Sequence, residues 1–261
     1  MQKYGGSLIH RSHDAYGVLE IIDHTDTRSL HFGTPHLQSR MRRGNPVELM
    51  VAYTRYMLAA LLFLKGNPGQ ILLLGLGGGS LAKFLLSHYP HCRIQVVENR
   101  ASVIELAHSY FHLPHDPRLQ IDISDAGLFL RNHFRPKYDL ILVDIFDAWG
   151  PAETLANDNF FCACREALRK TGIISVNIWY HLKADQASAL SRLETAFDRW
   201  VLNLPVPDKD NHIALAFAQA IPAFSLQQLR RKVRELEERF AIGFPGVLRV
   251  LRRHNPEFLW Q

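Results

Sequence analysis

The segment of residues 71–80, ILLLGLGGGS, constrains the fold of this chain more than any other stretch. Its uncharged apolar start is typical of a strand buried on both faces, as in a parallel sheet covered by helices. The glycines that follow are Gly75, Gly77, Gly78 and Gly79. Glycine lets the backbone adopt positive φ and approach a ligand with no β-carbon in the way. Because a helical pattern follows over residues 81–88, the strand, turn and helix N-terminus together predict a nucleotide cradle.

A second strand pattern supports the nucleotide interpretation. It covers residues 93–97 and ends in Glu98, about twenty residues further on, where an acid commonly meets ribose hydroxyls. No Lys-Ser or Lys-Thr pair follows the glycines, which argues against a phosphate-binding P-loop. A purely structural turn is the alternative, since tight turns of every kind use glycine.

Strand and helix patterns alternate from residue 70 onward. The strands are expected at residues 71–75, 93–97, 119–123, 138–143, 173–178, 201–204 and 212–218, and the helices at residues 81–88, 101–111, 126–133, 157–169 and 184–198. This alternation predicts an α/β fold with a doubly wound, mostly parallel sheet of seven strands. Only a loop separates the last two strands, so they should form an antiparallel hairpin at one edge. Ligands of such sheets bind at the carboxyl ends of the strands.

The first 45 residues differ in character. Two short strand patterns, residues 17–23 and 29–33, flank a turn and are too short to bury a core alone. We therefore predict a small N-terminal β segment, residues 1–45, that packs on a neighbour or on a second subunit. A nucleoside-binding domain should occupy residues 46–261, opening with a helical pattern over residues 47–64.

Composition narrows the class of protein. With 261 residues, 47% of them hydrophobic, the chain can fold as one large domain or as one domain plus an appendage. The net charge is +5, and basic residues are densest at residues 230–253, where an ion-paired solvated helix is favoured over a nucleic-acid surface. Three cysteines without a CxxC pair suggest a reducing cytoplasm. We expect no signal peptide, membrane span or metal, since the matching patterns are missing.

Carboxylates follow several of the predicted strands. Asp125 precedes a helix, so it can cap that helix or accept a hydrogen bond from the exocyclic amine of a base. Asp144 and Asp147 follow the strand at residues 138–143. Two carboxylates this close repel each other, and a cation bound between them would relieve the repulsion. A pair of turn-capping aspartates is the alternative.

In this loop the chain resembles the spermidine/spermine synthase family of aminopropyltransferases, and the resemblance extends over most of the sequence. Asp144, Asp147 and Gly-Pro-Ala-Glu at residues 150–153 are similar to the family's catalytic loop, D-x-x-D-P-x-G-P-A-E. The resemblance implies catalytic roles for Asp144 and Tyr53, and binding of the substrate's ammonium groups by Asp147 and Asp208. It also implies cofactor contacts by Gly75, Gly77, Gly78, Gly79, Glu98, Asp125, Ala126, Pro151 and Gln38.

Several positions depart from the family pattern. The family's glycine turn carries an acid near the donor's aminopropyl ammonium, and Gly78 stands at that place. Ala148 replaces a proline after the second loop aspartate, and Arg100 replaces an acid two residues after Glu98. The turn at residues 207–210 lacks the expected aromatic side chains. These changes keep the adenosine half of the site and alter the polyamine half.

The resemblance implies a methyltransferase-like Rossmann fold and a spermidine synthase-like activity, the transfer of an aminopropyl group from decarboxylated S-adenosylmethionine to a di- or polyamine. It also implies a homodimer with small-molecule polyamine substrates. The residue patterns themselves predict a cytoplasmic protein with no metal and no membrane or nucleic-acid partner. The alternatives are a methyltransferase that uses intact S-adenosylmethionine, which the loss of the acid at Gly78 favours, and a non-catalytic nucleoside-binding protein.

Overall fold

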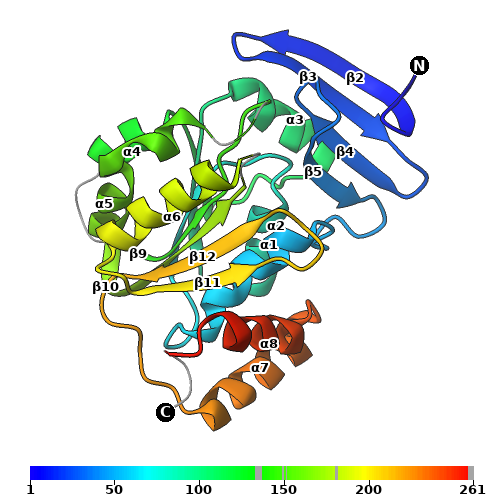
Figure 1. Ribbon diagram of the computed structural model, residues 1–261. Helices are drawn as coiled ribbons and strands as arrows, with labels where there is room; N and C mark the ends of the chain where they lie inside the picture. Colours follow the sequence, from blue (N-terminus) through cyan, green and yellow to red (C-terminus); the bar gives the residue numbers. More distant parts are fainter. Residues whose placement is uncertain (133–136, 149, 151, 180–181, 258–261) are drawn as a thin grey trace.

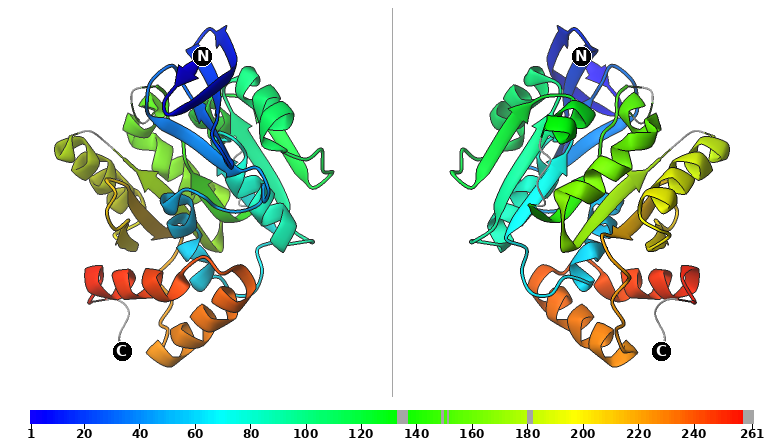
Figure 2. Two further views of the ribbon diagram at one scale, coloured as in Figure 1. Left: turned by 90° about the vertical axis from the view of Figure 1, so that its right-hand side faces the viewer. Right: turned by 90° about the vertical axis from the view of Figure 1, so that its left-hand side faces the viewer.

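The structure is a computed structural model that describes residues 1–132, 137–148, 150, 152–179 and 182–257. Within these residues the chain forms a five-stranded sheet near its start and a seven-stranded sheet from the remainder (Figure 1). Helices lie on both faces of the larger sheet. The smaller sheet projects from one end of the molecule, opposite the last two helices (Figures 1 and 2).

The seven-stranded sheet has the order β11-β12-β10-β9-β6-β7-β8. Its strands are β6 (Gln70–Leu74), β7 (Arg93–Glu98), β8 (Leu119–Ile123), β9 (Tyr138–Val143), β10 (Leu168–Ile178), β11 (Val201–Pro205) and β12 (His212–Phe217). The first five of these are parallel, and β12 pairs antiparallel with both β10 and β11. The predicted mostly parallel α/β fold, with an antiparallel hairpin at one edge, is confirmed.

The helices mostly agree with the predicted pattern. They are α1 (Ala52–Met57), the 3-10 helix η1 (Leu58–Leu62), α2 (Ser80–His88), α3 (Ala101–Phe111), α4 (Ala126–Asn132), the 3-10 helix η2 (Glu153–Ala156), α5 (Asp158–Ala167), α6 (Lys183–Ala196), α7 (Leu226–Phe240) and α8 (Phe244–His254). The helix expected at residues 157–169 ends earlier, because Leu168 already pairs with Tyr138 of β9. The helix expected at residues 47–64 is shorter and is split between α1 and η1.

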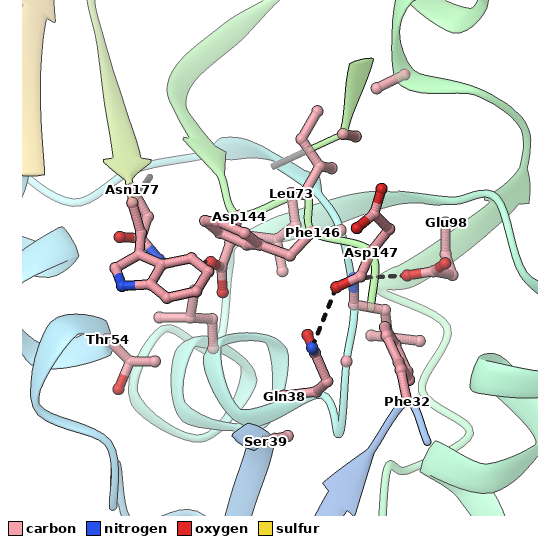
Figure 3. Close-up of a pocket in the computed structure, with 18 of the residues that line it drawn as sticks. Phe32, Gln38, Ser39, Thr54, Leu73, Glu98, Asp144, Phe146, Asp147 and Asn177 are labelled. Atoms are coloured by element: carbon pink, nitrogen blue, oxygen red, sulfur yellow. Dashed lines mark hydrogen bonds between the residues drawn. The ribbon is translucent and has the colours of Figure 1, made fainter. Parts of the chain in front are cut away.

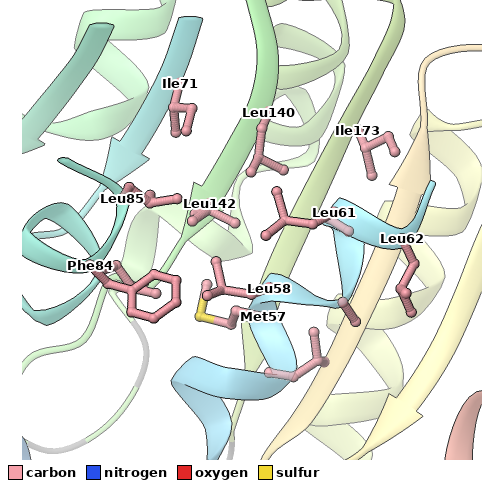
Figure 4. Close-up of a cluster of buried hydrophobic side chains, with 14 of the residues drawn as sticks. Met57, Leu58, Leu61, Leu62, Ile71, Phe84, Leu85, Leu140, Leu142 and Ile173 are labelled. Carbon is pink, nitrogen blue, oxygen red and sulfur yellow. The ribbon is translucent and has the colours of Figure 1, made fainter. Parts of the chain in front are cut away.

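The core forms two layers, one on each face of the larger sheet. On one face, η1 packs its five buried residues against Ile71, Leu140 and Leu142 of the central strands, together with α2 (Figure 4). The opposite face of the same strands packs against α4, α5 and α6. Burial of a leucine side chain contributes about 1.5–3 kcal/mol. This continuous burial explains why the central strands lack alternating polar residues.

The five-stranded sheet is antiparallel throughout. Its strands are β1 (Gln2–Lys3), β2 (Gly6–Asp14), β3 (Gly17–Asp23), β4 (Thr27–His31) and β5 (Leu37–Arg42), in sequence order. Only the third and fourth were predicted. β2 escaped prediction because polar residues dominate both of its faces. Those on one face are exposed and those on the other are half-buried. The division of the chain into two domains at residues 45 and 46 stays a prediction.

Arg100 fastens the small sheet to the larger one. Leu19, Ile21 and Leu30 pack with residues of α3 in a separate apolar cluster. Beside this cluster, the buried Arg100 guanidinium forms an ion pair with Asp14 at 2.9 Å and lies 4.5 Å from the ring centre of Phe32. The departure from the family pattern at Arg100 therefore has a structural role at this contact.

The last two helices cover the sheet edge away from the small sheet. α7 buries Leu229, Val233 and Leu236 in the main core, and its basic residues are mostly exposed. Lys232 forms an ion pair with Glu235 at 3.3 Å. This arrangement agrees with the predicted solvated helix. Over the residues that the structure describes, no helix combines the length and the apolar character needed to cross a membrane.

Candidate active site

A cavity of about 330 Å³ opens at the carboxyl edge of the parallel strands (Figure 3). Gly75, Glu98, Asp144 and Asn177 line it, and each comes from the end of a different strand, β6, β7, β9 and β10. Because β6 and β9 are neighbours while β7 lies on the other side of β6, the cavity sits where the strand order reverses. This is the position at which open α/β sheets bind ligands.

The glycine turn forms the floor of the cavity. Gly75, Gly77 and Gly79 have positive φ values of 94°, 54° and 68°, which an L side chain rarely adopts. The amide of Gly75 donates a hydrogen bond to Val97 at 2.9 Å, which ties the turn to β7. Of the predicted glycines, Gly75 and Gly77 line the cavity.

Gly78 and Gly79 are not among the described residues that line the cavity. A β-carbon on Gly78 would lie 2.7 Å from Ser39 Oγ and 2.9 Å from the ring of Phe111, and one on Gly79 would lie 2.8 Å from Leu113. The position at which the family carries an acid is therefore filled by β5 and α3.

A buried lysine fixes the end of α3, which carries the Phe111 ring that lies beside Gly78. Lys83 of α2 donates a hydrogen bond from Nζ to the carbonyl oxygen of Phe111 at 2.5 Å. Burial lowers the pKa of Lys83 to about 8. The ammonium lies at the C-terminal end of α3, where a positive charge is favourable.

Glu98 joins the glycine turn to the start of α3. Its two carboxylate oxygens accept hydrogen bonds from the amides of Leu76 and Arg100, each at 3.0 Å. Burial raises the pKa of Glu98, and the two amide donors partly offset this effect. The side chain also lines the cavity. Its remaining lone pairs can accept hydrogen bonds from a pair of hydroxyl groups.

Asp125 and Ala126 lie at the next strand end, beyond Glu98. Asp125 caps α4 by accepting a hydrogen bond from the amide of Leu128 at 2.8 Å, and it accepts a second from the hydroxyl of Thr154 at 2.7 Å. The capping role predicted as one alternative is therefore present. Both Asp125 and Ala126 also line the cavity, so a role in binding a base stays a prediction.

Asp144 lies at the other end of the cavity, beside Asn177 (Figure 3). Tyr53 of α1 donates a hydrogen bond from its hydroxyl to Asp144 Oδ2 at 3.0 Å, and Asn177 donates from Nδ2 to Oδ1 at 2.9 Å. Burial raises the pKa of Asp144, and these two hydrogen bonds lower it. Burial, followed by the nearby carboxylate, raises the pKa of Tyr53 well above its ordinary value, so the phenol stays a donor.

Asp147 is exposed at the cavity wall, three residues further along the loop. Its Oδ1 accepts a hydrogen bond from the amide of Gly150 at 2.9 Å, as expected for a turn-capping aspartate. Its backbone carbonyl accepts one from Gln38 of β5 at 3.2 Å (Figure 3). The loop is thereby linked to the small sheet, and Gln38 also lines the cavity.

Besides Gly78 and Gly79, one further predicted site residue, Asp208, is not brought to the cavity. Asp208 is exposed in the turn between β11 and β12, with a φ of 58°, and is not among the described residues of the cavity wall. Lys209 and Asn211 of the same turn line the wall instead. Pro151 lies outside the described residues.

Sequence reasoning missed a group of residues at the Asp144 end of the cavity. Asn177 is the most informative of them, because it is an amide between the apolar residues Val176 and Ile178 at the end of β10. The ring centres of Phe146 and Trp179 are 6.2 Å apart, and His36 lies 5.6 Å from Trp179, so aromatic faces form this part of the wall. Among the residues described, no cluster of three or more His, Cys, Asp or Glu side chains could hold a metal ion.

The solved structures that resemble the chain share its fold. A probable spermidine synthase from Corynebacterium glutamicum has a TM-score of 0.74 and 20% identity, over 98% of this chain and 95% of that one. Spermidine synthase from Thermotoga maritima has a TM-score of 0.73 and 20% identity, over 94% and 84%. Human methyltransferase-like protein 13, solved with SAH, has a TM-score of 0.68 and 22% identity, over 73% and 93%.

Sequence similarity is more specific. The model of the spermine/spermidine synthase domain matches residues 50–207. The polyamine aminopropyltransferase of Chromobacterium violaceum is 32% identical over 244 residues, which cover 94% of this chain and 93% of the relative. The one from Neisseria meningitidis serogroup B is 32% identical over 237 residues, or 90% and 89%. The chain therefore belongs to the spermine/spermidine synthase family.

Proposed function

We propose that the chain is a spermidine synthase-like aminopropyltransferase, which moves an aminopropyl group from decarboxylated S-adenosylmethionine to a di- or polyamine. The observation that carries this proposal is Asp144, a half-buried carboxylate beside the glycine turn that accepts hydrogen bonds from Tyr53 and Asn177. The names of the relatives, polyamine aminopropyltransferases, support the same reaction.

The adenosine half of the site fits a nucleoside donor. The turn at Gly75 and Gly77 leaves the cavity floor without side chains, and Glu98 presents a carboxylate whose position is fixed by two amides. We assign the ribose hydroxyls to Glu98 and the base to Asp125 and Ala126. When bound, the donor supplies a sulfonium that activates its adjacent carbon toward a nucleophile.

The acceptor end must remove a proton before reaction. An alkylamine has a pKa of ~10.4, so its nitrogen is mostly protonated at neutral pH. Asp144 is the base in this proposal, because it is the carboxylate that Tyr53 and Asn177 hold at the cavity wall. Asp147 binds an ammonium group of the acceptor. General-base assistance of this kind contributes ~10²–10⁴-fold to the rate.

In the transfer, the lone pair of the amine nitrogen forms a bond to the carbon beside the sulfonium. The bond between that carbon and sulfur breaks, and sulfur keeps the electron pair, which leaves methylthioadenosine. The proton lost from nitrogen goes to Asp144. Exclusion of water and orientation of the two reactants supply most of the remaining acceleration.

A second candidate is a transferase that uses intact S-adenosylmethionine. The observation that favours it is the environment of Gly78, which lacks the family's acid and lies beside the neutral hydroxyl of Ser39. Gln38 and Ser39, which line the cavity beside Gly77, are also uncharged. A donor carboxylate would meet less repulsion there than in the family's usual site.

The deciding experiment is a product assay by mass spectrometry with mixed amines and each donor in turn. Aminopropylated amine and methylthioadenosine are expected with decarboxylated S-adenosylmethionine. Calorimetry with both donors and with methylthioadenosine measures the preference directly. A preference of tenfold or more for the carboxylated donor, ~1.4 kcal/mol, would overturn the first proposal in favour of the second.

We also propose that residues 1–45 act as a separate small domain through which a cytoplasmic homodimer forms. The five-stranded sheet supports this, because β1 pairs with only Gly6 and Ser7 of β2, and alternate residues of β2 face solvent. Sedimentation equilibrium of the full chain tests it, and a purely monomeric protein at micromolar concentration would exclude the dimer.

A further inference from the structure

Two asparagines form a chain of hydrogen bonds that ends on Asp144. Asn211 donates from Nδ2 to Asn177 Oδ1 at 3.0 Å, and Asn177 donates from Nδ2 to Asp144 Oδ1 at 2.9 Å. All three side chains line the cavity. Asn211 therefore reaches the proposed base through one intermediate residue, without contacting it in any hydrogen bond of the described structure.

The chain of hydrogen bonds has a direction. The two ends of an asparagine amide have nearly the same shape, but one end donates and the other accepts. Only the donor end stabilises an ionised carboxylate. Asn177 Oδ1 accepts a hydrogen bond from the NH₂ group of Asn211. The NH₂ group of Asn177 therefore faces Asp144. Asn211 thus selects one of two otherwise similar orientations of Asn177.

The sheet holds the two asparagines in register. β10 and β12 pair antiparallel, with Asn177 opposite Ile213. Asn211 lies two residues before Ile213, just outside the start of β12, so the pleat places the side chains of Asn211 and Ile213 on the same face. The backbone carbonyl of Asn211 also accepts a hydrogen bond from the amide of Val206 at 3.0 Å, which closes the β11–β12 turn. The antiparallel hairpin is therefore what brings an amide to the base.

We propose that Asn211 is a positioning residue for the transfer reaction, acting through Asn177 to hold the carboxylate of Asp144 ready to accept the proton of the incoming amine. The inference rests on the proposed function, because it assigns Asp144 as the base. The turn between β11 and β12 was expected to provide a substrate-binding carboxylate, Asp208. In this proposal the turn instead provides the amide of Asn211, which does not contact the reacting atoms.

The surroundings of Asp144 make the amide chain important. Burial raises the pKa of Asp144, and no cationic side chain is among its hydrogen-bond partners in the described structure. The other titratable side chains of the cavity wall are His36, Tyr53, Glu98, Asp125, Asp147 and Lys209. Tyr53 and Asn177 are thus the donors that favour ionisation, and Asn211 controls one of these two.

Asn211→Asp is the sharpest test, because it keeps the shape of the side chain and removes the donor. Asn177 would then turn its NH₂ group toward residue 211 and its carbonyl oxygen toward Asp144. Loss of a donor and gain of a repulsive oxygen disfavour the ionised form of Asp144. The acidic limb of the kcat/KM profile is expected to move upward by about one pH unit or more. Asn211→Ala should lower kcat about tenfold, since Asn177 is no longer fixed.

Asn203→Ala is the matched control. Asn203 of β11 shares a hydrogen bond of 2.9 Å with His212, the neighbour of Asn211, and it is not among the described residues of the cavity wall. Its loss loosens the same hairpin without touching the amide chain. The pH profile of this variant should match that of the unaltered protein, and binding of methylthioadenosine should be unchanged in all three variants.

A readout independent of turnover separates this inference from the proposed function. Carbon-13 NMR of labelled aspartate carboxyls, with Asp144→Asn to assign the signal, follows the titration of Asp144 directly. Because Asn211→Asp also adds a negative charge, an upward shift supports the inference only when the uncharged Asn211→Ala shifts in the same direction. This pair of shifts supports the inference even if no donor and amine pair reacts, in which case only the proposed function fails. A shift confined to Asn211→Asp would report the new charge and would overturn the inference. An unshifted titration in Asn211→Asp, or an equal shift in Asn203→Ala, overturns the inference even in an active enzyme.

Discussion

Gly75 and Asp144 lie back to back where β6 and β9 end side by side. A β-carbon on Gly75 would overlap the backbone carbonyl oxygen of Asp144, and the amide of Asp144 donates a hydrogen bond to Leu74 at 2.8 Å. The turn that forms the cavity floor and the loop that carries the proposed base are therefore one packed unit. A change in either residue should affect the other.

Gly75→Ala tests this contact. The substitution must relieve an overlap with backbone and also place alanine at a φ of 94°, so we expect a loss of at least about 2 kcal/mol in the free energy of unfolding. Urea denaturation measures it. Gly44→Ala is the control, because its β-carbon would meet no atom within 4 Å, and it should change stability by less than about 0.5 kcal/mol. Equal effects of the two substitutions would contradict the prediction.

Asp144→Asn should separate activity from stability. The rate of transfer is expected to fall ~10²–10⁴-fold, because the base is lost, while affinity for methylthioadenosine stays within about twofold. Since burial raises the pKa of Asp144 above the ordinary 3.8, the native state binds more protons than the unfolded chain between these two values. The free energy of unfolding therefore falls as pH rises through that window. At pH 7 the neutral variant Asp144→Asn should have a higher free energy of unfolding than the unaltered protein. A less stable variant at pH 7 would be inconsistent with this reasoning.

Gly78→Asp restores the family's acid in a place that has no room for it. The new β-carbon would lie 2.7 Å from Ser39 Oγ and 2.9 Å from the Phe111 ring, and overpacking of this kind costs about 1–3 kcal/mol. Calorimetry should find no gain in affinity for decarboxylated S-adenosylmethionine. Adding Ser39→Gly should recover part of the lost stability. Tighter binding by Gly78→Asp alone would show that the turn can shift to admit the acid.

Lys83→Met should remove a pH dependence at the alkaline end. Because burial lowers the pKa of Lys83 from 10.5 to about 8, the unfolded chain binds more protons than the native state between these values. Stability should therefore rise with pH across this window, by roughly 3 kcal/mol at most. Guanidinium denaturation at pH 7.5 and 10 measures this rise in the unaltered protein. The rise should vanish in Lys83→Met and persist in Lys65→Met, where the lysine is exposed.

Sequence reasoning worked best for features that depend on strand order alone. Once the chain is recognised as alternating β and α, the carboxyl ends of the parallel strands must share one edge, which brings the glycine turn, Glu98 and Asp144 together. Resemblance to a family added Tyr53, whose hydroxyl reaches Asp144 across 91 residues of sequence. No local pattern could have predicted that contact.

Contacts that depend on side-chain packing were not predictable. Loss of the acid at Gly78 predicted a missing charge, but the sequence could not show that Ser39 and Phe111 fill the space there from two other elements. The turn after β11 was expected to provide Asp208, yet the register of the hairpin delivers Asn211. The start of β10 carries a helical pattern, which pairing of Leu168 with β9 overrides. In each case a partner distant in sequence decides the outcome.

The position of β5 in the cavity wall limits how the N-terminal sheet can change during evolution. Gln38 donates a hydrogen bond to the loop of Asp147, and Ser39 fills the space beside Gly78. The N-terminal sheet therefore forms part of the candidate active site. Exchange of this segment for an unrelated one should leave the larger sheet able to fold, but it would remove Gln38 and Ser39 from the cavity wall and so alter the proposed donor site. The two parts of the chain should therefore be inherited together, and donor preference should follow the origin of the first strands.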